Sequence, residues 1–367
     1  MTIAERDLAH RMLLAGEELS AGTIQWGQRP TLPPHLALTD RDLRLMALLH
    51  GANFLSTSQL VVLGWGRRRE RAAQMRLKRL HDAGYVDRFR PAYARGRAEW
   101  NYRLSSQGFS ALSQLEVIAE EHSYTPAALT SISYAEHDLQ LAALVLQIAT
   151  EASEGHDGAL IERMPFEWRG PRNGRIDVEW GRGAEPSAAA QLAPGTRFHH
   201  EQSRRGYLEP DATLIAGSGG QRWAVLIEYD RTARPHKQID RLRRYDGFLL
   251  DGWKCTDFAS HAIPPSVIFL TSRERPLRAL IKAADQTFSA WYGREHGPRE
   301  GTHAARERVL FSSRERVLAG DWTMFRAPAI PPALRENPLA CRPGSIEYDL
   351  PSLLAAAKRL ATPTGAG

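Results

Sequence analysis

The segment Tyr207–Tyr245 constrains the fold more than any other part of this sequence, because it contains two strand patterns separated by a short turn. Leu208–Ala216 is rich in strand-forming residues, and Trp223–Tyr229 is an apolar run of the length of a buried strand. The intervening glycines are typical of a tight turn. We therefore expect two neighbouring strands, followed by a helix that carries several arginines.

Three carboxylates are placed by these strands. Asp211 follows Pro210, and Glu228 and Asp230 end the second strand. Carboxylates that converge on adjacent strands are the ligands of a hard cation such as Mg²⁺ or Mn²⁺, and a buried carboxylate needs such a partner. A metal site formed by the three is one interpretation. The alternative is a cluster neutralised by nearby cations, namely Arg231, Arg234, Lys237 or Arg241.

The composition is that of a globular protein with room for two domains. The chain has 367 residues, of which 43% are hydrophobic and 25% charged. It contains no apolar run of transmembrane length and no signal-peptide pattern, so we expect no membrane association. Its two cysteines, Cys255 and Cys341, are too few for a disulfide framework. A cytoplasmic location is the default expectation.

The positive charge is concentrated in one segment. The net charge is +6, but residues 67–103 alone carry 12 Lys and Arg against four Asp and Glu. Around them, helix signals begin after Thr39, after Ser56 and near Arg68, and two strand-like runs follow. Three helices and a hairpin are the plan of a winged helix-turn-helix, which we assign to residues 38–121.

This plan predicts which cations meet double-stranded DNA. The third helix would enter the major groove, with Lys78 or Arg79 on the flanking backbone, and the tip of the hairpin would enter the adjacent minor groove. The predicted DNA-binding residues are Arg67, Arg68, Arg69, Arg71, Arg76, Lys78, Arg79, Arg95 and Arg97. Met75 is expected on the inner, apolar side of the same helix. The alternative is a solvated basic face or a protein-interaction module.

The remaining sequence predicts a second domain over residues 133–326. Residues 1–37 read as an irregular lead-in, and 327–367 as a mostly flexible tail with one possible helix. The expected elements of the second domain begin with a strongly apolar helix that must pack on a sheet or a partner. They are helix Ala135–Ala152, strands Ile161–Trp168 and Ile176–Trp180, the two strands above, helix His236–Leu249, strand Ser266–Thr271 and helix Pro276–Trp291.

The resulting order, helix, three strands, helix and strand, resembles the restriction-endonuclease-like core with its Pro-Asp and Glu-x-Lys motifs. Together with the winged helix, His137-Asp138, Pro210-Asp211 and Glu228-Tyr229-Asp230, it is similar to the replication-relaxation family of plasmids and mobile elements. The resemblance covers roughly residues 38–325. It implies an α+β, two-domain, DNA-associated protein that acts in the control of replication, with a nuclease-like second domain.

The sequence departs from the nuclease pattern at one position, because Asp230 stands where the catalytic lysine is expected. If the domain is active, the resemblance implies a catalytic set of Asp211, Glu228 and Asp230 with Lys237 as a substitute lysine. Three hypotheses follow. We favour a DNA-binding regulator with a silent nuclease-like domain. The others are a metal-dependent endonuclease or nickase, and an interaction protein that docks a replication partner or a second copy.

Overall fold

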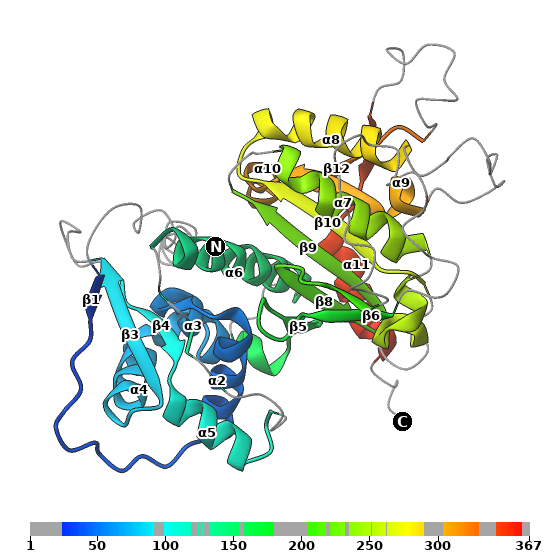
Figure 1. The fold of residues 1–367 in the computed structure, drawn as a ribbon. Coiled ribbons are helices and arrows are strands. Elements are labelled where there is room, and N and C mark those ends of the chain that lie inside the picture. The colour runs from blue at the N-terminus through cyan, green and yellow to red at the C-terminus, as the bar shows by residue number, and fades with distance from the viewer. Residues whose placement is uncertain are drawn as a thin grey trace. The chain divides into compact units, whose positions relative to one another are not determined.

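A computed structural model divides the chain into two compact units, Met1–Asn173 and Gly174–Gly367, which we call unit 1 and unit 2. Each combines helices with strands (Figure 1), so a two-unit α+β protein is confirmed. The structure describes residues 24–91, 99–118, 124, 126, 127, 129, 132–153, 158–179, 205–217, 221–231, 235–250, 252–261, 263–289, 304–329 and 343–361.

Three helices form the first part of unit 1. They are α2 (Asp40–Ala52), α3 (Thr57–Gly64) and α4 (Glu70–Asp82), with the 3-10 turn η2 (Arg67–Arg69) ahead of α4. Thr39 caps α2 and Ser56 caps α3, and in both caps the residue three positions on, Asp42 or Gln59, bonds back to the cap backbone. These capping boxes satisfy N–H groups that the first turn of a helix leaves open. Both predicted caps are confirmed.

An antiparallel hairpin follows the helices. It consists of β3 (Val86–Pro91) and β4 (Asn101–Leu104), paired from Val86↔Leu104 to Phe89↔Asn101. The short strand β2 (Leu55–Ser56) pairs with β4. The tip between the two long strands lies outside the described residues, and with it Arg95 and Arg97.

The expectation of an irregular lead-in is wrong at one place. The strand β1 (Ile24–Trp26) pairs antiparallel with β3, and the sheet has the order β1-β3-β4-β2. The Trp26 ring lies 5.6 Å from the Phe89 ring, which anchors β1 to the hairpin. A three-residue strand carries too little alternation to be recognised from the sequence.

The apolar helix expected at 135–152 is α6 (Ile132–Ala152), and it groups with unit 1. Ala135 and Leu139 join Phe54 and Phe89 in one buried cluster. In addition, the Gln59 side chain donates a 2.8 Å hydrogen bond to the Leu139 carbonyl. The helix therefore has its apolar partner within this chain. The predicted domain boundaries at 121 and 133 stay predictions.

The predicted strand Ile161–Trp168 is mostly wrong. A 3-10 turn, η3 (Leu160–Glu162), occupies its first two residues, and only β5 (Glu167–Arg169) is strand. Pro165 lies between them and cannot donate a ladder hydrogen bond, which explains the break.

Unit 2 is built on a mixed sheet with the strand order β13-β12-β11-β10-β9-β8. The central strands β9, β10 and β11 run parallel, whereas β8, β12 and β13 pair antiparallel with their neighbours. Their bounds are β8 (Ala212–Ala216), β9 (Trp223–Asp230), β10 (Ser266–Thr271), β11 (Val309–Ser313), β12 (Thr323–Arg326) and β13 (Gly344–Glu347). β9 is buried from Ala224 onward, as its apolar sequence predicts.

The strand expected over Leu208–Ala216 is divided in two. β7 (Arg205–Leu208) pairs with β6 (Ile176–Glu179), and β8 begins only at Ala212. Pro210 lies in the gap and lacks the N–H that a continuous ladder would use. The break places Asp211 directly before β8, beside the end of β9.

Two helices cover one face of this sheet. α7 (Pro235–Leu250) connects β9 to β10, and α8 (Glu274–Ser289) lies between β10 and β11 in the chain. They lie side by side over the parallel strands (Figure 1). Alternate residues of the strands, such as Leu226 and Phe269, share a buried cluster with Tyr245 and Phe248 of α7. Because side chains alternate along a strand, Glu228 and Asp230 face the same side as Leu226.

Part of the expected flexible tail belongs to unit 2. β13 pairs with β12 from Thr323↔Glu347 to Arg326↔Gly344. After it, α11 (Leu350–Ala361) contacts β8 and buries Leu350 and Leu354 completely. The amphipathic pattern of α11 is visible in the sequence. The strand that it contacts, β8, lies more than 130 residues away, and the pattern does not identify it.

Candidate functional site

The face of α4 that points away from the core is strongly basic. Ala73, Leu77 and Leu80 form the buried stripe of the helix. The opposite side, together with η2, presents a set of exposed side chains that we call the basic face. It consists of Arg68, Arg69, Arg71, Ala72, Gln74, Met75, Lys78 and Arg79. Five of these are cations, so the helix offers a positively charged surface to an anionic partner.

Most of the cations predicted on this helix lie on the basic face. Lys78 forms an i,i+4 ion pair with Asp82 and keeps 60% of its side chain exposed. Arg67 belongs to η2, but its side chain lies outside the described residues. Met75 was expected to face inward and is 61% exposed, which corrects that prediction. The 3.6-residue period places residues 73, 77 and 80 inward and turns residue 75 outward.

Arg76 has a different environment from the other predicted cations. Its Nε lies 3.0 Å from Asp42 Oδ1, its Nη2 bonds the other carboxylate oxygen, and it donates a 2.8 Å bond to the Ala37 carbonyl. Burial raises the pKa of Asp42, but the bonds from Arg76 and Thr39 outweigh it and hold that pKa below its usual value. Arg76 therefore fastens α4 to the start of α2.

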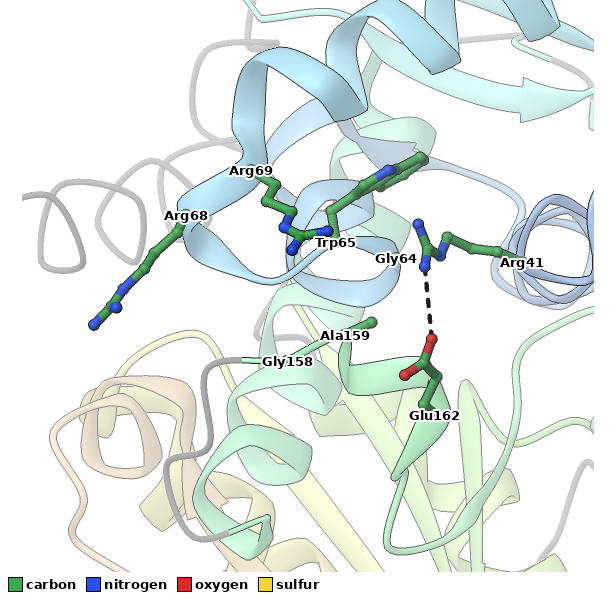
Figure 2. A pocket seen from close by; sticks show the side chains of 8 residues that line it. All are labelled: Arg41, Gly64, Trp65, Arg68, Arg69, Gly158, Ala159 and Glu162. Atoms are coloured by element: carbon green, nitrogen blue, oxygen red, sulfur yellow. Dashed lines mark ion pairs between the residues drawn. The ribbon is translucent and has the colours of Figure 1, made fainter.

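A pocket of about 410 Å³ opens next to the basic face (Figure 2). Its lining is Arg41, Gly64, Trp65, Arg68, Arg69, Gly158, Ala159 and Glu162. The Arg41 guanidinium lies 5.7 Å from the centre of the Trp65 ring and 3.7 Å from the Glu162 carboxylate. In Figure 2, the Arg68 side chain extends away from Trp65. The lining is therefore basic, although Arg41 is already paired with Glu162, and such a lining suits an anionic group.

The pocket involves residues that sequence reasoning missed. Trp65 stands in the turn between α3 and α4, next to Gly66, whose φ of 73° is a left-handed conformation that glycine tolerates. A Gly-Trp-Gly turn directly ahead of three arginines was a visible signal. Arg41 lies on α2, and nothing in its local sequence indicates that it reaches this turn.

In unit 2, the structure brings together the carboxylates that the sequence singles out. Ala212 pairs with Ile227, so Asp211 comes next to Glu228 along the two strands. The Asp211 Oδ2 atom accepts a 2.7 Å hydrogen bond from the backbone N–H of Tyr229. Glu228 and Asp230 are only 2% and 6% exposed.

Two side chains of α7 bond Glu228, and one of them, Arg241, carries the opposite charge. Arg241 Nη1 donates to its Oε2 over 2.5 Å, and Tyr245 Oη donates to its Oε1 over 2.5 Å. Burial, and then the charge of Glu228, raise the pKa of Tyr245 well above its ordinary value. Burial lowers the pKa of Arg241, but the attraction of Glu228 and Asp211 outweighs it and the pKa is raised. The group is therefore a buried carboxylate with a tethered cation.

The bonds from α7 compete with a divalent cation for Glu228. Each of its oxygens already accepts one bond from α7, which leaves fewer lone pairs for Mg²⁺ or Mn²⁺. Across the described ranges, no group of three or more His, Cys, Asp and Glu side chains is arranged to hold a metal ion. Lys237 is in α7, and its side chain is outside the described residues. Catalysis by Asp211, Glu228, Asp230 and Lys237 stays a prediction.

A family model for replication-relaxation proteins matches residues 46–258, more than half of the chain. The chain belongs to the replication-relaxation family. The match extends from within α2 to the segment between α7 and β10. It therefore includes the basic face of this replication-relaxation protein, and also Glu228 with its partners Arg241 and Tyr245, which we call the Glu228 cluster. Family membership suggests a role in the replication of a plasmid or mobile element. No curated protein and no solved structure matches the chain. No helix among the described residues is long and apolar enough to cross a bilayer.

Proposed function

We propose that this replication-relaxation protein is a double-stranded-DNA-binding regulator of replication in a plasmid or mobile element. In this proposal, unit 1 acts as a winged helix-turn-helix, α4 enters the major groove, and Arg95 and Arg97 enter the adjacent minor groove. The observation that supports it is the basic face: five exposed cations surround the side of α4 opposite its buried stripe. Cations around a helix of this kind are what phosphate contacts require.

We further propose that unit 2 is a nuclease-like scaffold that does not cleave DNA. Its β8, β9 and β10 strands and the α7 crossover follow the order expected of a restriction-endonuclease-like core. Two observations favour a silent site. Asp230 replaces the usual lysine, and Arg241 and Tyr245 occupy both oxygens of Glu228. An interaction role for α6 has less support, because the apolar side chains that it would offer to a partner are buried.

Fluorescence anisotropy with a labelled duplex at several salt concentrations tests the DNA-binding part. We expect the affinity of the wild type to fall as salt rises, and the Arg68→Ala/Arg69→Ala variant to bind more weakly. The salt slope should decrease by about 0.9 for each phosphate contact removed. Arg278→Ala is the matched control, since it removes an exposed arginine of α8. Absence of binding by the wild type at low salt would overturn the proposal.

Incubation with supercoiled plasmid and Mg²⁺ or Mn²⁺ tests the scaffold part. We expect no more nicking by the wild type than by Asp211→Ala. If nicking is present in the wild type and absent in that variant, unit 2 is a nickase and the scaffold proposal is wrong, whatever the DNA-binding result.

A further inference from the structure

Met75 lies at the centre of the basic face. Its side chain is 61% exposed, whereas Met46 and Met324 are buried at 1% and 0%. At a helical period of 3.6 residues, its neighbours on the surface are the positions three and four away, which are Arg71, Ala72, Lys78 and Arg79. A single exposed apolar residue needs no explanation by itself. Here the position is informative, because cations flank it on both sides along the helix.

The centre and the margins of such a face meet different parts of a duplex. When a helix lies in the major groove, side chains at its margins reach the phosphates, and those at its centre meet the edges of the bases. Residue 75 is almost diametrically opposite the stripe formed by Ala73, Leu77 and Leu80, so it would project towards the floor of the groove. The apolar group displayed there is the 5-methyl group of thymine.

We propose that Met75 reads thymine, by packing its thioether chain against the 5-methyl group in the major groove. The flexible, polarisable side chain of methionine adapts to such a contact, and the small, exposed Ala72 beside it leaves room for the methyl group. This inference rests on the proposed function, since it needs α4 in the groove. It assigns to this residue a share of the sequence specificity that the surrounding cations do not provide.

The test replaces thymine by deoxyuracil, which pairs identically but lacks the 5-methyl group. A binding site is first selected from a pool of random duplexes with the wild-type protein, and each thymine in it is then replaced singly. We expect one replacement to weaken wild-type binding about fourfold, the value that follows from burying one methyl-sized group. Met75→Ala should bind the thymine duplex about fourfold more weakly and no longer distinguish the two duplexes. Met75→Leu should retain the distinction.

The control is Arg79→Ala, one turn along the same face. It should weaken binding to both duplexes equally and reduce the salt slope, because a phosphate contact carries no information about the base.

A selected site without thymine, or equal loss of affinity by Met75→Ala on both duplexes, would overturn the inference and leave the proposed function intact. If Met75→Ala lowers the oligomeric mass in sedimentation without changing the thymine preference, Met75 is a contact between copies and the inference is wrong. Failure of every duplex to bind would overturn the proposed function itself.

Discussion

Arg76 of α4 and Asp42 of α2 form a two-point ion pair in which Arg76 Nε lies 3.0 Å from Asp42 Oδ1. The Asp42 side chain is 1% exposed and also closes the capping box of α2. The pair therefore joins the start of one helix to the middle of another. It also gives Arg76 a different environment from the exposed cations around it, which have similar sequence surroundings.

Replacing Arg76 by Ala should destabilise unit 1 without a specific effect on DNA contacts. The change leaves a buried carboxylate without its cation, which costs about 3 kcal/mol in the free energy of unfolding. Urea denaturation measures this value. Arg79→Ala, on the exposed side of the same helix, should change stability by less than about 0.5 kcal/mol and reduce DNA affinity instead. Equal stabilities of the two variants would contradict this assignment.

Tyr245→Phe should lower the stability of unit 2. The variant keeps the packing of the ring but leaves Glu228 Oε1 without its buried donor, a loss of about 1–3 kcal/mol. Denaturant unfolding followed by tryptophan fluorescence reports it. Tyr207→Phe is the comparison, because Tyr207 is 44% exposed and its hydroxyl should be dispensable. In the double variant with Glu228→Gln, the effect of Tyr245→Phe should shrink, since the acceptor has lost its charge.

Asp246 should make stability depend on pH. Burial raises its pKa to about 7 from an ordinary 3.8, against the opposing effect of Arg306. The folded state therefore holds the proton more tightly than the unfolded chain. Its contribution to stability is fully present below pH 3.8 and is lost as the pH rises towards 7. We expect Asp246→Asn to gain stability relative to the wild type over this range. Urea denaturation at a series of pH values measures the free energy of unfolding of both proteins. If the wild type and Asp246→Asn depend on pH in the same way, the raised pKa of Asp246 is wrong.

Neighbouring leucines of α11 test whether the end of the chain belongs to the folded unit. Leu354 is 0% exposed and Leu353 is 44% exposed, so they differ in burial but not in chemistry. Leu354→Ala should cost about 2–4 kcal/mol through lost burial and a residual cavity, and Leu353→Ala less than about 0.5 kcal/mol. The midpoint of thermal unfolding measures both. If neither variant changes it, α11 contributes nothing to unit 2.

Local signals in the sequence predict individual helices and strands better than they predict which elements pack against one another. The caps at Thr39 and Ser56 are correct because a hydroxyl and the N–H groups of the next turn are close in the sequence itself. The strand Ser266–Thr271 is correct because a short apolar run with branched residues suits a buried parallel strand. Each of these signals depends only on residues that are close together in the sequence.

What the sequence does not predict depends on distant surfaces. The ion pair of Arg76 requires α2 and α4 to meet at a particular angle, and β1 exists only because the edge of β3 is available to it. The Glu228 cluster was predicted in part, because its carboxylate is visible in the sequence but its partners are not. The pairing of Glu228 with Arg241 was one of the alternatives open from the sequence, but which of the four nearby cations reaches Glu228 depends on how α7 lies over β9.

The tethered cation at Glu228 has a consequence for how unit 2 responds to its surroundings. In a metal site, the positive charge exchanges with the solution, so a chelator or a competing ion can remove it. Arg241 is part of the chain, and its local concentration at Glu228 is set by the packing of α7 rather than by any solute. While α7 stays on the sheet, no chelator or competing ion can remove that charge. The charge balance of Glu228 is therefore coupled to the folding of unit 2.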